Sequence, residues 1–257
     1  MIVVHDPLDP RVDGYRALRA RESGEVVWAE GPTVVERLLR SRHRTRSVLV
    51  TPAALEQLHP ILAGRDADVF VAERDVIATI VGFDLHRGAI AIGDRPAPVE
   101  LDHVLPAAQL LVMVEGVNDA ENLGAIGRSA LALGADALVL DPTCADPWYR
   151  RSVRVSMGAL LHLPVVRAVR WSATLDDIVA AGFDVWALTP SPAATPIGAL
   201  ARGPRLAVLA GAEGPGLAAT TLARFTNVRI PMHHSVDSLN VGHAIAAALA
   251  VVQSSDP

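Results

Sequence analysis

The segment Ile230–Gly242, IPMHHSVDSLNVG, joins the end of a short apolar run to the start of a long Ala-rich one. The residues NVRIP favour a strand that ends at Pro231, and Leu239–Gln253 favours a helix. Ser238 and Asn240 flank the expected start of that helix, where either side chain could serve as an N-cap. The segment is therefore predicted to be a polar loop between a strand and a helix.

Two earlier connections between a strand and a helix are polar in the same way. The residues VNDAENLGAIGR follow the predicted strand Leu110–Val117 and open a helix over Asn122–Ala135, the place where α/β proteins bind ligands. The residues LAGAEGPGL lead from another strand into a Gly-rich loop with one acid, Glu213, and glycine lets a backbone approach a ligand closely. Three of the chain's four Asn lie in the polar connections: Asn118 and Asn122 in the first of these two, and Asn240 in Ile230–Gly242. This placement favours a use for their amides, although Asn122 is also a natural N-cap.

Strands and helices alternate along the chain, and the units become longer in the second half. This alternation favours an α/β fold with a parallel sheet covered by helices on both faces. In the first half, strands are expected at Glu25–Gly31, Ser47–Val50, Asp68–Ala72 and Gly88–Gly93, with helices led by Pro32 and Pro52. The stretch 94–106 holds three prolines and repeats no period, which indicates a linker. We therefore expect a smaller domain over residues 1–98 and a larger one over 106–257.

The charge of the chain limits how it could bind RNA. All 23 basic residues are Arg, yet the net charge is -5, which excludes RNA binding by bulk attraction. Any RNA site must be a local patch. The candidate is a cluster of five arginines in ten residues without an acid: Arg37, Arg40, Arg42, Arg44 and Arg46. A solvated helix end explains the same cluster equally well.

The remaining composition points to the cytoplasm. Cys144 is the single cysteine, so no internal disulfide can form. The N-terminal residues do not resemble a secretory signal, and no apolar run approaches the roughly 20 residues of a membrane helix. His233, His234 and His243 lie close together, but no cysteine or carboxylate spacing completes a metal site. We expect neither a membrane nor a metal as a partner.

Taken in order, the three polar connections resemble motifs one to three of the SpoU/TrmH-type RNA 2′-O-ribose methyltransferases of the SPOUT class. The matching patterns are N-L-G-A-I-x-R-x-A, G-A-E-G-x-G-L and I-P-M-x-x-x-x-x-S-L-N-V. The resemblance spans roughly Leu110–Val252, and residues 1–98 more loosely resemble the L30e-like substrate-binding domain common in the family. It implies a sheet tied in a trefoil knot that holds S-adenosyl-L-methionine, an exception to the near-absence of knots. It also implies a homodimer with the active site at the subunit interface.

The resemblance assigns roles residue by residue. Five positions would line the cofactor site: Thr189, Gly211, Ile230, Met232 and Leu239. Five would form the reacting centre: Asn122, Arg128, Glu213, Ser238 and Asn240. Two positions depart from the family, which often has Gly where His234 stands and Ser where Gly242 stands. His234 is expected to change the local shape of the loop, whereas the intact S-L-N core favours retained activity.

The implied reaction is an in-line attack of a ribose 2′-hydroxyl on the methyl group of the cofactor. The family account often makes the motif-one arginine, here Arg128, the general base. A guanidinium with a pKa above about 12 is a poor proton acceptor. We therefore expect Arg128 to grip the adjacent phosphate and stabilise the forming alkoxide, while the proton passes to that phosphate, Glu213 or water.

Two other kinds of function remain as alternatives. A catalytically inactive RNA-binding or ribosome-assembly protein could keep the fold, but it would be free to lose Asn122, Arg128, Glu213 and Asn240. A nicotinamide-dependent enzyme would need the G-x-G-x-x-G spacing, which glycines 116, 124 and 127 do not provide. The favoured function is methylation of structured RNA, with ribosomal RNA preferred over transfer RNA as the substrate.

Overall fold

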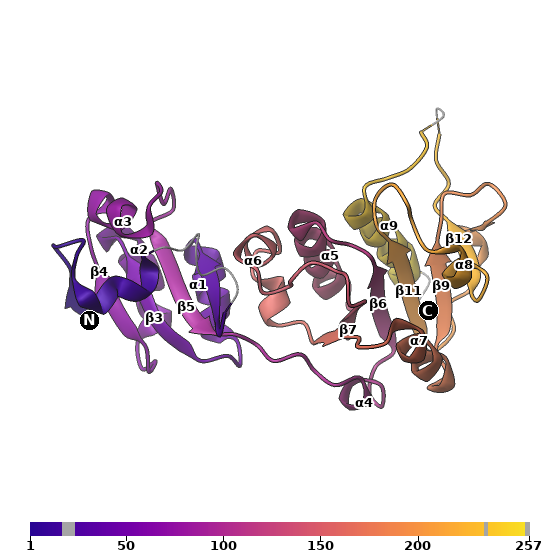
Figure 1. Ribbon diagram of the computed structural model, residues 1–257, viewed down its shortest axis with the longest axis horizontal. Helices are drawn as coiled ribbons and strands as arrows, with labels where there is room; N and C mark the ends of the chain where they lie inside the picture. The colour runs from indigo at the N-terminus through magenta and orange to yellow at the C-terminus, as the bar shows by residue number, and fades with distance from the viewer. Residues whose placement is uncertain (17–23, 234–235, 255–257) are drawn as a thin grey trace. The chain divides into compact units, whose positions relative to one another are not determined.

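The computed structural model describes residues 1–16, 24–233 and 236–254 (Figure 1). His234 lies outside these residues, so its effect on the loop stays a prediction. The chain forms two compact units: unit 1 is Met1–Ala97 with Trp148–His162, and unit 2 is Pro98–Pro147 with Leu163–Pro257. The second segment of unit 1 is inserted between two strands of unit 2, and no sequence pattern indicated this insertion.

Unit 1 is built on a five-stranded mixed sheet of order β1-β4-β3-β5-β2. Strands β1, β4 and β3 run parallel, and β5 pairs antiparallel with both β3 and β2. Its elements are β1 (Ile2–Val3), η1 (Pro10–Tyr15), β2 (Val26–Glu30), α1 (Pro32–Arg40), β3 (Thr45–Val50), α2 (Pro52–Leu62), β4 (Asp68–Val71), α3 (Arg74–Val81), β5 (Ala89–Asp94), α6 (Arg150–Val155) and η2 (Ala159–Leu161). The four strands expected here are confirmed to within two residues at each end.

The two helices led by proline begin as expected. Pro32 and Pro52 occupy the first turn of α1 and α2, where a missing N–H costs nothing. Helix α1 buries Val34, Val35 and Leu38, which share one helical face. On this sheet, Trp28, Leu49, Phe70 and Ile90 form part of a core in which Tyr15 is also buried.

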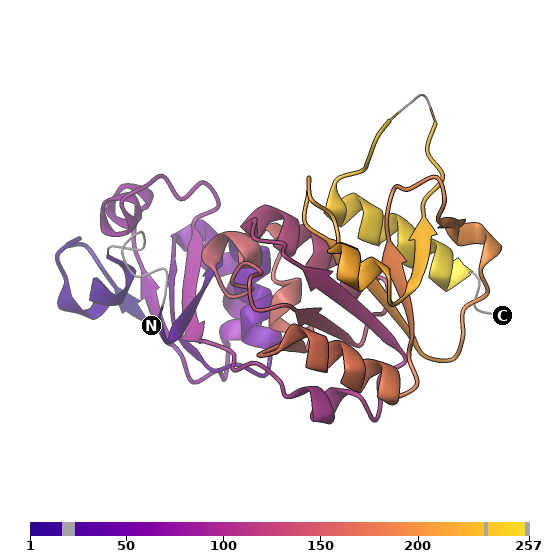
Figure 2. The same cartoon turned by 45° about the vertical axis from the view of Figure 1, so that its right-hand side comes forward.

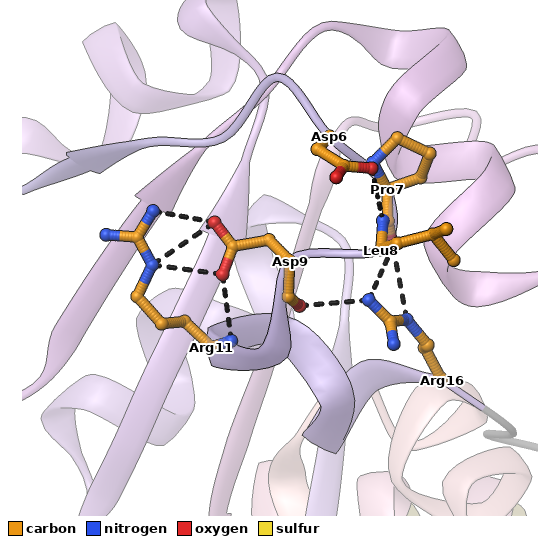
Figure 3. A network of polar contacts seen from close by, with 6 residues as sticks. All are labelled: Asp6, Pro7, Leu8, Asp9, Arg11 and Arg16. Atoms are coloured by element: carbon orange, nitrogen blue, oxygen red, sulfur yellow. Dashed lines mark hydrogen bonds and ion pairs between the residues drawn. The ribbon is translucent and has the colours of Figure 1, made fainter.

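The residues that follow β1 are held by a polar network (Figure 3). The carboxylate of Asp9 accepts hydrogen bonds from the backbone N and the guanidinium of Arg11, at 2.9 Å from N and 2.6 Å from Nη2. The guanidinium of Arg16 donates to the carbonyl oxygens of Pro7 and Asp9, at 2.7 Å and 2.9 Å. Asp9 is the N-cap of η1, so its bond from the backbone N of Arg11 stabilises the start of this helix at Pro10.

This network predicts an unusually acidic carboxyl group. The hydrogen bond from the Arg11 guanidinium lowers the pKa of Asp9 from 3.8 to about 2. Because folding lowers this pKa, ionised Asp9 stabilises the folded state above pH 3.8. This contribution to the free energy of unfolding is lost as the pH falls toward 2. In an NMR titration of side-chain carboxyls, Arg11→Ala is expected to return the pKa of Asp9 toward 3.8, and an unchanged value would contradict this account.

Unit 2 is built on a seven-stranded sheet of order β10-β12-β9-β11-β6-β7-β8, in which every pairing is parallel (Figures 1 and 2). Its elements are α4 (Leu101–Val104), β6 (Leu110–Glu115), α5 (Ala120–Ala132), β7 (Ala137–Leu140), β8 (Val165–Arg167), α7 (Trp171–Ala180), β9 (Asp184–Leu188), β10 (Thr195–Pro196), η3 (Ile197–Ala199), β11 (Leu206–Gly211), α8 (Ala219–Leu222), β12 (Thr226–Arg229) and α9 (Val241–Ser254). The predicted parallel sheet is confirmed.

Helices cover both faces of this sheet, as its strand sequences require. Leu111, Met113 and Val139 lie on the face that packs with α7. Because side chains alternate along a strand, the residues between them face the opposite side, where α5 and α9 pack against each other (Figure 1). The stretch predicted as a linker, 94–106, includes the end of β5 and the short helix α4 rather than only irregular chain.

The order of the strands brings late segments into the middle of the sheet. Strand β11 pairs with both β6 and β9, so it lies between two strands that precede it in the sequence. Helix α9, which follows β12, then packs against α5 from the start of the unit. The carboxyl ends of β6, β9, β11 and β12 consequently share one edge of the sheet. The trefoil knot implied by the resemblance stays a prediction.

Arg205, just before β11, ties three carbonyl groups together. Its guanidinium donates to the oxygens of Ala108 at 3.2 Å, of Ala181 at 2.5 Å and of Leu105, and it lies 4.3 Å from the ring centre of Phe183. The acceptors come from two segments of unit 2: Leu105 and Ala108 lie between α4 and β6, and Ala181 follows α7. No smaller side chain reaches all three, so Arg205 is expected to contribute strongly to the stability of this unit.

Arg205→Ala is expected to lower the free energy of unfolding by about 3 kcal/mol, because hydrogen bonds to a charged group are worth about 1.5–3 kcal/mol. Urea denaturation measures the change. The control is Arg224→Ala, which removes an exposed ion pair to Asp176 and should cost at most about 1 kcal/mol. Equal losses for the two variants would contradict a special role for Arg205.

Candidate active site

A cavity of about 460 Å³ opens at the carboxyl ends of β9, β11 and β12. Its volume lies in the range of roughly 300–1,000 Å³ that is usual for small-molecule sites. The lining combines apolar side chains with backbone: Leu188, Thr189, Pro190, Ala210, Gly211, Ala212, Glu213, Gly214, Gly216, Val228, Ile230, Met232, Ser238, Leu239, Asn240, Val241 and Ala244. Such a surface can hold the apolar parts of a ligand against side chains while backbone groups bind its polar parts.

The side-chain amide of Asn240 joins the three polar connections at one wall of this cavity. Its Nδ2 donates to Oδ1 of Asn122 at 2.7 Å and to Oε1 of Glu213 at 2.5 Å. These partners are 118 and 27 residues away in the sequence. One amide therefore fixes the positions of the other two groups.

Helix capping at these connections differs from the simplest expectation. Asn122 is not the N-cap of α5: the cap is Asp119, whose carboxylate accepts from the backbone N of Asn122 at 2.8 Å. The side chain of Asn122 is thereby free to face Asn240. At α9, Oδ1 of Asn240 does accept from the backbone N of Gly242 at 2.9 Å, so this amide caps a helix and also reaches the site.

The Gly-rich loop after β11 folds back on itself. The backbone N of Gly216 donates to the oxygen of Ala212 at 2.9 Å, and Gly214 and Gly216 both have positive φ, at 86° and 70°. A Cβ on Gly211 would lie 2.2 Å from the carbonyl carbon of Gly216. Only glycine at position 211 permits this approach, which leaves backbone at the wall of the cavity.

Most of the residues assigned from the sequence gather around the cavity. The five residues expected at a cofactor site all line the cavity, and Glu213, Ser238 and Asn240 of the expected reacting centre line it too. Asn122 reaches the wall through Asn240. Arg128 does not line the cavity: it is exposed on α5 and makes no hydrogen bond or ion pair to any residue that the structure describes.

Gly242 matches the close packing of α9 on α5. A Cβ at this position would lie 3.0 Å from Cβ of Ala125 and 3.2 Å from Oδ1 of Asn240. Serine, which the family often has here, would need these neighbours to move apart by a few tenths of an ångström. Glycine at position 242, where the family often has serine, therefore coincides with a tight contact between α9 and α5.

The arginine cluster of unit 1 is only partly available for binding. Arg37 donates to the oxygen of Met157 at 2.8 Å, Arg40 pairs with Glu36 at 2.9 Å, and Arg46 pairs with Asp94 at 2.5 Å. These three arginines therefore have partners, although no acid lies between residues 37 and 46 in the sequence. The side chains of Arg42 and Arg44 are exposed, and neither forms a hydrogen bond or ion pair within the described ranges.

Comparison with known proteins adds a family and a set of relatives. Residues 109–250 match the model of the SpoU rRNA Methylase family. An uncharacterized tRNA/rRNA methyltransferase of Mycobacterium tuberculosis is 43% identical over 96% of this chain and 89% of its own length. The 23S rRNA (guanosine(2553)-2′-O)-methyltransferase RlmP of Bacillus subtilis is 27% identical over 86% of this chain and 85% of its own.

A solved structure covers nearly the whole chain. The AdoMet-bound rRNA methyltransferase of Sinorhizobium meliloti superposes with a TM-score of 0.81 at 25% identity, over 98% of this chain and 97% of its own. Among the described residues, no helix has the length and apolar character needed to cross a bilayer.

Proposed function

The chain belongs to the SpoU rRNA Methylase family, and from that premise we propose that it transfers a methyl group to a ribose 2′-hydroxyl of structured RNA. The cofactor is S-adenosyl-L-methionine. The cavity beside β11 fits it, because a glycine cradle and the apolar side chains of Leu188, Ile230 and Leu239 form its walls. The observation that carries the proposal is the amide of Asn240, which holds Asn122 and Glu213 at the edge of this cavity.

The chain's own residues would act mainly by placing the reacting groups. When bound, the cofactor supplies a methyl group that is already activated by its sulfonium. Thr189, Gly211, Ile230, Met232 and Leu239 line the cavity and would hold the cofactor in one orientation. Asn240 fixes Glu213, and the proton of the 2′-hydroxyl would pass to Glu213, to an RNA phosphate or to water.

Arg128 would contact the RNA, and it would do so at the cavity of a second copy of the chain. Its side chain is exposed, lies outside the cavity of its own chain, and has no partner among the described residues. A guanidinium can grip a phosphate with two parallel hydrogen bonds and stabilise a forming alkoxide, whereas it is a poor base. A homodimer in which Arg128 of one protomer completes the cavity of its partner accounts for this placement.

Ribosomal RNA is the proposed substrate, in preference to transfer RNA. The name of the Bacillus subtilis relative specifies 2′-O-methylation of 23S rRNA, which supports this choice. Unit 1 would bind the RNA, with Arg42 and Arg44 as the available arginines of its cluster. The net charge of -5 favours a small contact area over broad coating of the RNA.

Transfer of labelled methyl groups from S-adenosyl-L-methionine to total RNA, fractionated by size, tests this function. Label is expected in the ribosomal RNA fraction and is expected to be lost with Arg128→Ala. Calorimetric binding of the cofactor without label in any RNA fraction would instead indicate a protein that keeps the site but not catalysis.

A further inference from the structure

Glu115, the last residue of β6, accepts three hydrogen bonds through one carboxylate. Its Oε2 accepts from Nε1 of Trp171 and from Oγ1 of Thr221, both at 2.7 Å, and its Oε1 accepts from the backbone N of Ala218 at 2.8 Å. Thr221 is buried and Glu115 is half-buried. All three partners are donors, which suits an ionised carboxylate because it can only accept.

Two of these bonds hold the end of the Gly-rich loop. The loop leaves the sheet at Gly211, the residue paired with Glu115 in the ladder between β11 and β6. It returns at Ala218, directly before α8, which contains Thr221. The backbone of Glu115 therefore lies beside the start of the loop, and its side chain binds the residue where the loop ends.

The residues between these two points form a large part of the cavity wall. Ala212, Glu213, Gly214 and Gly216 all line it, whereas Glu115 does not. Glu115 thus has no direct contact to offer a ligand in the cavity. Its effect on a ligand can only pass through the shape of the loop.

We propose that Glu115 is a positioning residue of the S-adenosyl-L-methionine site, where its carboxylate fixes the return of the loop Ala212–Leu217 and thereby the place of Glu213 beside Asn240. A loop fixed before binding does not have to be ordered when the ligand arrives, which favours affinity. The proposal rests on the cofactor and is independent of which RNA atom receives the methyl group.

Glu115→Gln tests the proposal with little change in size. An amide has one acceptor oxygen and one donor NH₂ group. If its oxygen keeps Trp171 and Thr221, its NH₂ faces the N–H of Ala218, so the bond that ends the loop is lost. We expect the calorimetric dissociation constant for S-adenosyl-L-methionine to rise about tenfold, since bonds to a charged group are among the stronger ones.

The matched control is Asp136→Asn. Oδ2 of Asp136 accepts from the backbone N of Gln109 at 2.7 Å and of Leu110 at 2.9 Å, at the opposite end of β6. This variant removes a carboxylate that, like Glu115, accepts backbone hydrogen bonds, but it binds the start of β6 and lies away from the cavity. Its melting temperature is expected to fall while its affinity for the cofactor is unchanged.

Two milder variants keep the proposal testable if Glu115→Gln does not fold. Thr221→Val removes only the hydroxyl that binds next to the loop and should weaken cofactor binding about threefold, a modest effect in line with one lost hydrogen bond. Trp171→Phe removes the bond to α7 and should leave the affinity unchanged. Unchanged affinity in Glu115→Gln or Thr221→Val, with a melting temperature lowered as in Asp136→Asn, would overturn the proposal and leave Glu115 a purely structural residue.

Discussion

Gly211→Ala is expected to weaken binding of S-adenosyl-L-methionine by about 10- to 100-fold, since overpacking costs about 1–3 kcal/mol and 1.4 kcal/mol is tenfold in affinity. The added Cβ would lie 2.2 Å from the carbonyl carbon of Gly216 and 2.3 Å from the backbone N of Leu217. Both neighbours are backbone atoms, which cannot turn aside as the end of a side chain can. The loop must therefore move away from β11, which changes the cavity wall that the loop forms.

The matched control for this change is Gly198→Ala in η3. A Cβ there would meet nothing within 4 Å, and the residue has no positive φ. Isothermal titration of both variants with the cofactor measures the difference. Wild-type affinity in Gly211→Ala would show that the loop does not form the wall of the cofactor site.

Arg128→Ala is expected to lower the rate of methyl transfer by about 100-fold or more, the usual loss when one group that stabilises developing charge is removed. The affinity for the cofactor is expected to stay unchanged, because Arg128 does not line the cavity of its own chain. Arg170→Ala is the control, since it removes another exposed arginine of unit 2. Arg128→Lys should recover little activity, because lysine keeps the charge and loses the planar fork.

Mixing two inactive variants tests where Arg128 acts. If it completes the site of a partner subunit, a dimer of one Arg128→Ala chain and one Asn240→Ala chain has one site without either defect. Activity should then reappear on mixing under conditions that exchange subunits. An inactive mixture whose subunits have exchanged would place Arg128 outside the partner's site.

The strands and the site were largely predictable because their signals are local. Apolar runs bounded by Pro and Gly indicated most strands of both sheets, though not the two-residue strands β1 and β10. The polar connections at Asn122, Glu213 and Asn240 stood out in sequence order. The structure brings these three side chains together through Asn240. The interpretation of Asn122 as the N-cap of its helix was wrong for a reason that is also local. Asp119, three residues earlier, is an equally good capping residue and forms the cap.

Residues whose partners are distant in the sequence could not be found in this way. The donors that Glu115 binds are 56, 103 and 106 residues away, so an acid at the end of a strand gave no sign of its role. Arg37 lies in a cluster that suggests RNA binding, yet it donates to Met157, 120 residues later. The place of Trp148–His162 in unit 1 likewise depends on contacts that only the folded chain brings together.

The central claim is that the methyl group goes to a ribose 2′-oxygen, and the position of the label in methylated RNA tests it most directly. Alkali cleaves RNA through attack by the 2′-hydroxyl, so a 2′-O-methylated nucleotide stays joined to its neighbour. The account predicts that, after complete alkaline hydrolysis of ribosomal RNA methylated by the wild-type protein, the label is found in dinucleotides. Label found only in mononucleotides would place the methyl group on a base and would contradict the account.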